Sequence, residues 1–400
     1  MKPLYFLFIF LSIGLSLSKR FEFHEDGSFT ILQLTDLHLC NYPNWDNVTH
    51  QVIRDLIKAT EPDLVIITGD VVARERQTLF TGFYEKAWRA LTQIFNETKT
   101  YYALTLGNHD LDLDLTAEQI LDMDMAHPYS ATEKNLFTHP ATYTIPIFSR
   151  INPENISANL WFFDTGSYGC AGNRWSYGCV EEDQIEWYNS KSSKLKEVYG
   201  TSAQHIAFLH IPLPEYMDLY NSYTFYGGLQ EKVCCPFHNT GLLSAIKKNG
   251  DISAVFCGHD HLNNYGGFLD GIELVYGRKT GRANSGPPVG IQRGGRVIKL
   301  YEEKGADGTI RTYREHFIVN ADGTFEFNKM VNKRTGPKQI ECMGAYGHSK
   351  SFYTRIMVGI ITGAILAIVL LVCFVSCLVS KKKYPDPEKA YFSSENVVIG

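Results

Sequence analysis

Five short apolar runs, each followed at once by aspartate, asparagine or histidine, are the feature that most restricts the fold of this chain. The runs cover residues 29–34, 64–68, 101–106, 204–209 and 252–257. They consist mainly of Ile, Val, Leu and Phe, which is typical of strands buried on both faces of a sheet. The polar groups that follow them are Asp36-Leu37-His38, Gly69-Asp70, Gly107-Asn108-His109-Asp110, His210 and Gly258-His259-Asp260-His261. Because the carboxyl ends of strands in an α/β sheet form sites at one edge, these side chains are predicted to converge.

Amphipathic segments between the runs complete the α/β pattern. Helices are predicted at residues 48–60, 82–95, 182–197 and 240–248, and two late strands at 296–301 and 312–320. This alternation favours an α/β fold in which sheets are covered by helices. The formal net charge of −5 provides no basic footprint, so nucleic-acid binding is not expected.

The residue types in the polar groups point to metal-assisted chemistry on phosphate esters. Two divalent cations about 3.5–4 Å apart can clamp a phosphate and generate hydroxide between them. Such cations need carboxylate and amide oxygens together with neutral imidazoles. Asp70, after a tight glycine turn, is placed to bridge the two ions. Because side chains alternate along a strand, Asp36-x-His38 and His259-x-His261 are each expected to present two ligands on one extended face.

The order of these groups resembles the signature of the calcineurin-like metallophosphoesterase superfamily over roughly residues 29–300. More narrowly, residues 210–216 and 258–264 resemble a purple-acid-phosphatase-like branch of small plant and fungal phosphatases. The resemblance implies a two-sheet β-sandwich flanked by helices. It also implies a phosphatase that hydrolyses phosphomonoesters by attack of a metal-bound hydroxide, with two divalent ions of Fe, Zn or Mn.

Carried over position by position, the resemblance assigns a role to each polar residue. The first ion would be held by Asp36, His38 and His261, the second by Asn108, His210 and His259, with Asp70 bridging. His109 would stabilise the transition state or protonate the leaving oxygen, and Asp110 would orient His109. Ala73 stands where purple acid phosphatases carry an iron-binding tyrosine, so no iron-tyrosinate centre is expected.

Two other functions stay open from sequence. The same kind of site serves phosphodiesterases, for example those that act on a lipid headgroup or a nucleotide. A ligand-binding or receptor module could also keep the fold without turnover. Activity on mono-esters and bis-esters, and the metal content of the protein, would separate these readings.

The two ends of the chain predict a single-pass type I membrane protein. Residues 1–18 have the basic start, apolar run and small-residue close of a signal peptide. The uncharged run 356–380 is long enough to span a bilayer, and Lys381, Lys382 and Lys383 after it place the tail 381–400 in the cytosol. Residues 19–335 would then form the luminal or extracellular domain and 336–355 a stalk. The membrane could be the plasma membrane or an endosomal or lysosomal one.

Sequons and cysteines agree with a luminal domain. Asn47, Asn96 and Asn155 each begin a glycosylation sequon. The spacing of Cys170 and Cys179 makes them the nearest candidates for a disulfide in an oxidising compartment. Cys257 ends an apolar run and is expected to be a buried free thiol. Cys234 and Cys235 form a vicinal pair, or else have separate partners or stay reduced.

Overall fold

The computed structural model describes residues 19–74, 80–200, 204–222, 224–284, 286–287, 290–331 and 337–383. The predicted signal peptide, residues 1–18, and the tail beyond residue 383 lie outside these ranges. The chain divides into two compact units, Met1–Gly347 and His348–Gly400.

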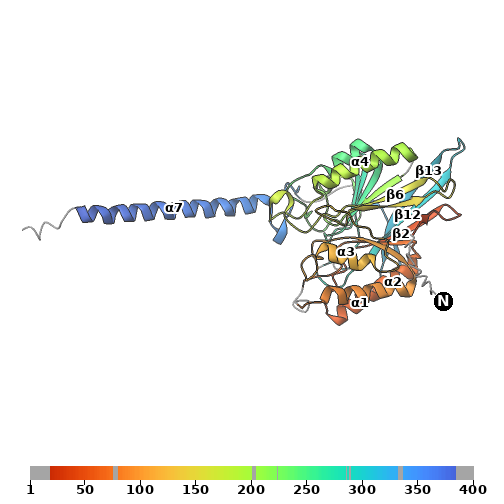
Figure 1. Ribbon diagram of the computed structural model, residues 1–400, viewed down its shortest axis with the longest axis horizontal. Helices are drawn as coiled ribbons and strands as arrows, with labels where there is room; N and C mark the ends of the chain where they lie inside the picture. The colour runs from red at the N-terminus through yellow and green to blue at the C-terminus, as the bar shows by residue number, and fades with distance from the viewer. Residues whose placement is uncertain are drawn as a thin grey trace, which may run out of the picture. The chain divides into compact units, whose positions relative to one another are not determined.

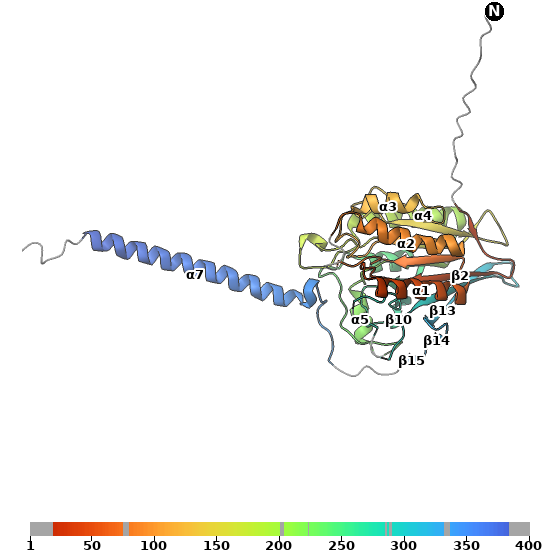
Figure 2. The same cartoon turned by 90° about the horizontal axis from the view of Figure 1, so that it is seen from below.

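Two sheets form the frame of the first unit (Figures 1 and 2). In spatial order, the first sheet contains β1 (Phe21–Glu22), β5 (Tyr143–Phe148), β6 (Ile156–Phe162), β7 (Gln204–Phe208), β9 (Ile252–Cys257), β11 (Ile272–Tyr276), β10 (Gly266–Leu269), β8 (Phe225–Tyr226) and β15 (Met330–Val331). The second sheet contains β14 (Phe325–Phe327), β13 (Ile310–Asn320), β12 (Gly294–Lys304), β2 (Ser28–Leu34), β3 (Leu64–Thr68) and β4 (Tyr101–Thr105). Both sheets are mixed, since parallel and antiparallel pairs occur in each.

Alternate residues of the central strands pack on opposite faces. In β2, Ile31 packs between the two sheets while Leu32 and Leu34 pack beneath the helices. In β9, Phe256 likewise faces the other sheet and Val255 faces the helices. Both faces are apolar, which explains why these strands appear in the sequence as unbroken apolar runs.

Helices cover the outer face of each sheet. The six-stranded sheet is covered by α1 (Pro43–Thr60), α2 (Phe83–Thr98) and α3 (Ala117–Met125), and the nine-stranded sheet by α4 (Glu182–Tyr199), α5 (Glu215–Asn221) and α6 (Leu242–Asn249). Figure 1 shows α1, α2 and α3 on one side of the two sheets and α4 on the other. The predicted sandwich flanked by helices is confirmed.

Several elements were not predicted because their sequences lack a clean apolar pattern. Strand β6 carries the buried polar residues Ser157 and Asn159, and β5 contains Pro146. Strands β10 and β11 are short and joined by the turn at Asp270 and Gly271. Helix α3 is only 9 residues long, although Thr116 forms a capping box at its start.

The disulfides resolve the cysteine alternatives. Cys170 pairs with Cys179, as the spacing predicted, and Cys235 pairs with Cys342 across 107 residues. The vicinal pairing is therefore wrong: Cys234 stays a thiol next to a disulfide. Cys257 is a buried free thiol, as expected.

The predicted stalk does not begin at residue 336. Gln339 is buried and its side-chain amide donates to the carbonyl oxygen of Val233 at 2.9 Å. The Cys235–Cys342 disulfide and the hydrogen bond from Ala345 N to Trp175 O fasten the same segment. The first unit therefore extends to Gly347. Gln339 and Cys342 resemble linker residues in the sequence, but one forms a buried hydrogen bond and the other a disulfide.

The second unit contains one long apolar helix, α7 (Lys350–Lys383). Residues Lys350–Leu378 are long and apolar enough to cross a membrane, and none of the apolar window is buried. This span includes most of the predicted segment 356–380. By length and composition α7 is a candidate membrane span.

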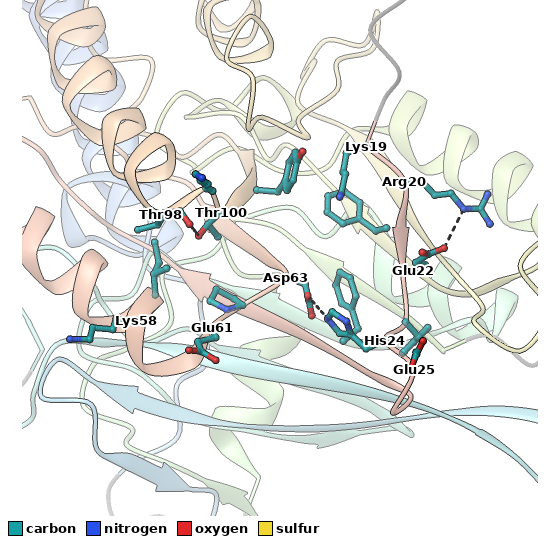
Figure 3. A pocket seen from close by; sticks show the side chains of 17 residues that line it. Lys19, Arg20, Glu22, His24, Glu25, Lys58, Glu61, Asp63, Thr98 and Thr100 are labelled. Carbon is teal, nitrogen blue, oxygen red and sulfur yellow. Dashed lines mark hydrogen bonds and ion pairs between the residues drawn. The ribbon is translucent and has the colours of Figure 1, made fainter.

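A cavity of about 830 Å³ lies where β2, β3 and β4 begin (Figure 3). Its walls come from β1 and from the ends of α1 and α2. His24 Nε2 contacts Asp63 Oδ1 at 2.6 Å, and Arg20 contacts Glu22 at 3.7 Å. Two acids in this cavity are therefore each paired with a base.

Candidate metal centre

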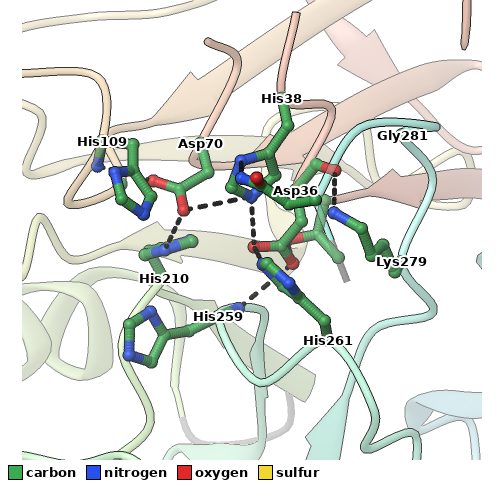
Figure 4. A network of polar contacts seen from close by, with 12 residues as sticks. Asp36, His38, Asp70, His109, His210, His259, His261, Lys279 and Gly281 are labelled. Atoms are coloured by element: carbon green, nitrogen blue, oxygen red, sulfur yellow. Dashed lines mark hydrogen bonds and ion pairs between the residues drawn. The ribbon is translucent and has the colours of Figure 1, made fainter. Parts of the chain in front are cut away.

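The predicted ligands lie on loops that leave the carboxyl ends of strands in both sheets. Strands β2, β3 and β4 are parallel neighbours in one sheet, and β7 and β9 are parallel neighbours in the other. Their ends therefore bring the loops together at one edge of the sandwich. Figure 4 shows Asp70 between His38 and His210, with Asp36 and His261 beside them.

The first group of ligand atoms comes from Asp36, His38, Asp70 and His261, which lie within 4.8 Å of one another. His38 Nε2 is 3.7 Å from Asp36 Oδ1 and 3.5 Å from Asp70 Oδ2. His261 Nε2 is 3.5 Å from Asp36 Oδ1. These separations exceed those of hydrogen bonds. They match two donor atoms that share a cation at about 2.0–2.2 Å.

The second group comes from Asp70, His210 and His259. His210 Nδ1 lies 2.7 Å from the carbonyl oxygen of Thr68 and donates its proton there. His210 Nε2 lies 3.3 Å from Asp70 Oδ2 and 3.2 Å from Asn108 Oδ1. Burial lowers the pKa of His210, but Asp70 raises it to about 9, so without a metal this nitrogen carries a proton. A cation could take the place of that proton, because a neutral His210 would then present a lone pair to it beside the two oxygen atoms.

Asp70 is shared by both groups. Its Oδ2 lies between His38 Nε2 and His210 Nε2, at the distances given above. Its Oδ1 accepts a hydrogen bond from the backbone N–H of His109 at 2.8 Å. Burial acts to raise the pKa of Asp70, but His210 and His109 outweigh it and hold this pKa far below its usual value. The carboxylate is thus ionised and lies where a bridging ligand is needed.

Buried polar atoms without a partner show that these residues fit a pair of cations. Among the described residues, Asp36 Oδ1, His38 Nε2 and His259 Nε2 are buried and accept or donate no hydrogen bond. Such atoms cost roughly 1–3 kcal/mol each when nothing compensates them. Burial, and then the proximity of His210, lower the pKa of His259 to about 3, so its imidazole is neutral as a metal ligand requires.

The backbone at the site is left-handed rather than extended. Asp36, His38, Asp70 and His259 have φ values of 54°, 48°, 54° and 77°. Non-glycine residues rarely adopt these angles, and they cluster at functional sites. The expectation that the two x-spaced pairs present ligands on an extended face is therefore wrong. Tight turns direct Asp36 and His38 inward. His261 belongs to the first group of ligands and His259 to the second.

Glycines next to the ligands leave no room for a side chain. A Cβ on Gly107 would lie 2.2 Å from Asp70 Oδ1. A Cβ on Gly258 would lie 2.0 Å from Thr35 Oγ1 and 3.1 Å from Asp36 Oδ2. These two glycines allow the loops from different strands to approach closely.

The structure corrects the role of Asp110. Its carboxylate accepts hydrogen bonds from the backbone N–H groups of Asp70, Val71, Val72 and Gly107, and so ties two ligand loops together. The side chain of His109 instead contacts Asp112, with Nδ1 and Oδ2 2.7 Å apart. Burial lowers the pKa of His109, but Asp70 and Asp112 together raise it to about 9.

Sequence reasoning missed two further neighbours of the ligands. The buried Lys279 Nζ donates to the carbonyl oxygen of Asp36 at 3.1 Å, and the side-chain amide of Asn284 lies 2.6 Å from His38 Nδ1. Both residues follow β11 (Ile272–Tyr276). The rule that polar residues follow strand ends would have found Lys279, had β11 itself been recognised.

The remaining predicted residues lie away from the centre. Asn47 and Asn96 are exposed on α1 and α2, and Asn155 is half-buried just before β6.

Comparisons with known proteins agree with this geometry. Probable inactive purple acid phosphatase 29 of Arabidopsis thaliana is 27% identical over 360 residues, which cover 79% of this chain and 90% of that protein. Phosphatase DCR2 of Saccharomyces cerevisiae is 28% identical over 349 residues, which cover 79% of this chain and 58% of that protein.

The comparison of structures supports the same fold. A dimetal phosphatase from Danio rerio superposes with a TM-score of 0.50 at 10% identity, over 76% of this chain and 99% of that chain. The family model described as calcineurin-like phosphoesterase matches residues 29–263, more than half of the sequence. On that match, the chain belongs to the calcineurin-like phosphoesterase family.

Proposed function

We propose that this protein is a membrane-anchored phosphatase that needs two divalent cations and hydrolyses phosphomonoesters. The observation that carries the proposal is the pair of ligand groups that share the Asp70 carboxylate. Family membership makes a phosphate ester the expected substrate class. Some relatives have names that call them inactive, so the ligand geometry of this chain is the main support for turnover.

The residues divide into those that hold cations and those that handle the substrate. Asp36, His38 and His261 would hold one ion, Asn108, His210 and His259 the other, and Asp70 both. Bound there, divalent cations would supply Lewis-acid chemistry that activates water and neutralises phosphate charge. Lys279 fixes the Asp36 backbone, and Asp110 fixes the Asp70 and Gly107 loops.

His109 is the proposed acid for the leaving oxygen. Its ring lies 5.4 Å from that of His38, at the border of the ligand groups, and Asp112 holds Nδ1. With Nδ1 engaged, Nε2 is the nitrogen that can donate a proton toward a substrate.

Metal removal and return test the proposal. Full-length protein in detergent is stripped with a chelator and reloaded with Zn²⁺, Mn²⁺ or Fe²⁺, and p-nitrophenyl phosphate hydrolysis is measured against metal content. Activity should disappear on stripping and return in step with a second ion per chain. A folded protein that binds two ions but hydrolyses neither mono-ester nor bis-ester would instead be a binding module.

Leaving-group dependence tests the role of His109. A His109→Asn variant should lose far more kcat on an alkyl phosphate than on p-nitrophenyl phosphate, because p-nitrophenolate leaves without a proton. Bis(p-nitrophenyl) phosphate in the same series tests the rival diesterase function. A higher kcat/KM on the bis-ester would favour that second function.

The membrane topology has its own test. A luminal or extracellular first unit, with α7 as the anchor, should carry glycans at Asn47, Asn96 or Asn155. Glycosidase treatment of protein from a eukaryotic host should then increase its mobility on a gel, and a variant with all three asparagines changed to glutamine should show no shift. Extraction by carbonate without detergent would contradict the anchor.

A further inference from the structure

The ligands of the two predicted ions have different neighbours. Asn108 and His259, both ligands of the second ion, contact a loop that is closed by a disulfide. This loop, residues 167–179, is called here the tyrosine loop. It lies between β6 and α4, and the Cys170–Cys179 disulfide closes it. Tyr168 and Tyr177 face each other across it, with ring centroids 5.7 Å apart.

Tyr168 contacts the amide of Asn108. The Nδ2 atom of Asn108 donates to the Tyr168 hydroxyl oxygen at 3.4 Å, while its Oδ1 lies 3.2 Å from His210 Nε2. An amide can present either its oxygen or its NH₂ group to a site, and only the oxygen binds a cation. The Tyr168 hydroxyl therefore contacts Asn108 on its NH₂ side and leaves the oxygen, the atom that can bind a cation, directed at His210.

Tyr177 contacts another ligand of the same ion. Its ring packs edge-to-face on the ring of His259, with centroids 4.4 Å apart at 83°. His259 sits on a left-handed backbone and its buried Nε2 has no hydrogen-bond partner among the described residues. Packing by Tyr177 is thus one of the forces that hold this imidazole in its rotamer.

The backbone of the tyrosine loop keeps both rings in place. Gly169 N donates to Ser176 O, and Gly178 N donates to Ser167 O, each at 3.0 Å. The hydroxyl of Ser176 accepts from Phe237 N at 2.9 Å. The disulfide joins the two sides of this small hairpin next to the tyrosines.

The other half of the centre has separate supports. Asp36 is held through Lys279 and Thr35, and His38 through Asn284. These residues lie in the loops after β2 and β11, far along the chain from the tyrosine loop.

We propose that the tyrosine loop positions Asn108 and His259, so that its disulfide and the Tyr168 hydroxyl control the affinity for the second cation but not the first. The inference rests on the proposed two-cation site. Tyr168, Tyr177, Cys170 and Cys179 are positioning residues, because they act through the ligands. Loss of such contacts typically costs 10–100-fold in metal affinity.

Metal binding without substrate is the test. Chelator-stripped full-length protein is titrated with Mn²⁺ by calorimetry, and electron paramagnetic resonance reports whether the two ions are magnetically coupled. Tyr168→Phe and the double variant Cys170→Ser/Cys179→Ser should each weaken the second binding step at least about tenfold. Both should show a mononuclear signal at a Mn²⁺ level that gives wild type a coupled one.

Matched variants identify the site that changes. His259→Ala should reproduce the pattern of Tyr168→Phe, whereas His38→Ala should not. Tyr301→Phe is the control for hydroxyl loss, since the Tyr301 hydroxyl donates to Glu315 on the β12–β13 hairpin. It should bind both ions like wild type. Thermal unfolding of each variant checks that it is folded.

Three outcomes overturn the inference. Wild-type affinities for both ions in Tyr168→Phe and in the double serine variant would do so, as would equal weakening of both steps. Wild type that never binds two ions would refute the proposed function and this inference together. Wild type that binds two ions but hydrolyses nothing would refute only the phosphatase, and the affinities would still decide the inference.

Discussion

The two edges of the sandwich differ in whether their charged and polar side chains are paired with one another. At the edge where β2, β3 and β4 begin, the large cavity contains two acid–base pairs, Arg20 with Glu22 and His24 with Asp63 (Figure 3). At the edge where these strands end, Asp36 Oδ1, His38 Nε2 and His259 Nε2 are buried and make no hydrogen bond within the described residues. Figure 4 shows these side chains grouped around Asp70. A cavity is thus a poor guide to chemistry in this fold. Metal-ligating atoms that are buried, make no hydrogen bond and lie close together are the better guide.

The largest effect should follow exchange of one carboxylate at each edge. Asp70→Asn removes the charge shared by both ligand groups, so kcat/KM should fall by roughly 1,000-fold or more and two-ion binding should be lost. Asp63→Asn, at the other edge, should leave both unchanged. Steady-state kinetics and metal analysis of the two proteins make the comparison. Equal losses in both would abolish the distinction between the edges.

Asp110→Asn should destabilise the protein as well as the site. The carboxylate accepts from backbone N–H groups of two loops, and an amide would turn an NH₂ group toward some of them. The expected loss is about 2–4 kcal/mol of unfolding free energy. Denaturant unfolding of the metal-free protein measures it. An unchanged midpoint with wild-type metal binding would show that Asp110 does not hold the loops.

A satisfied cluster between the sheets should control the acid limit of stability. Glu273 contacts Arg314 at 2.7 Å and His316 at 3.1 Å. Burial raises the pKa of Glu273, but His316 and Arg314 lower it more, to about 2. The stabilisation is complete above the ordinary glutamate pKa and is lost as the pH falls toward 2.

Glu273→Gln should therefore lower the free energy of unfolding by on the order of 3 kcal/mol at neutral pH. The loss of stability of the variant between pH 5 and pH 2 should also be smaller than that of wild type. Unfolding free energies between pH 2 and pH 7 give the answer. Phosphatase activity of the folded variant should stay near wild type, in contrast to Asp70→Asn. A parallel acid limb in both proteins would mean that Glu273 is not the group that titrates.

The smallest effect should come from Asp112→Asn. This change weakens the contact that orients His109, and we expect a loss of about tenfold in kcat on alkyl phosphates with little change in metal content. Asp114→Asn is the matched control two residues away, where the carboxylate instead receives a hydrogen bond from Gly82 N. Similar kinetics for the two variants would argue against a special role for Asp112.

The sequence predicted the layered fold because its central strands are buried on both faces. Ile31 and Leu32, or Val255 and Phe256, are all apolar, and this continuous pattern is easy to see. Strand β6 lacks this pattern because it carries buried polar residues. One of them, Ser157, donates a hydrogen bond to Glu302, which is far away in the sequence. Local patterns cannot reveal such long-range pairs.

The ligands were predictable because each follows a strand end, but their supports were not. Nothing near Asp110 in the sequence shows that it binds backbone N–H groups of the β3 loop, or that Asp112 is the partner of His109. Gln339 and Cys342 look like linker residues until the fold brings Val233 and Cys235 to them. These contacts depend on tertiary placement.

The Cys235–Cys342 disulfide also determines which fragments of the chain stay covalently joined after cleavage by a protease. The exposed turn between β12 and β13, residues 305–309, lies inside the covalent ring that this bond closes. A single cut in that turn leaves the piece with Asp36 through His261 joined to the piece that carries α7. The two fragments should separate on a gel only after reduction. Release of the ligand-bearing fragment from α7 by such a cut therefore requires a reductant as well as a protease.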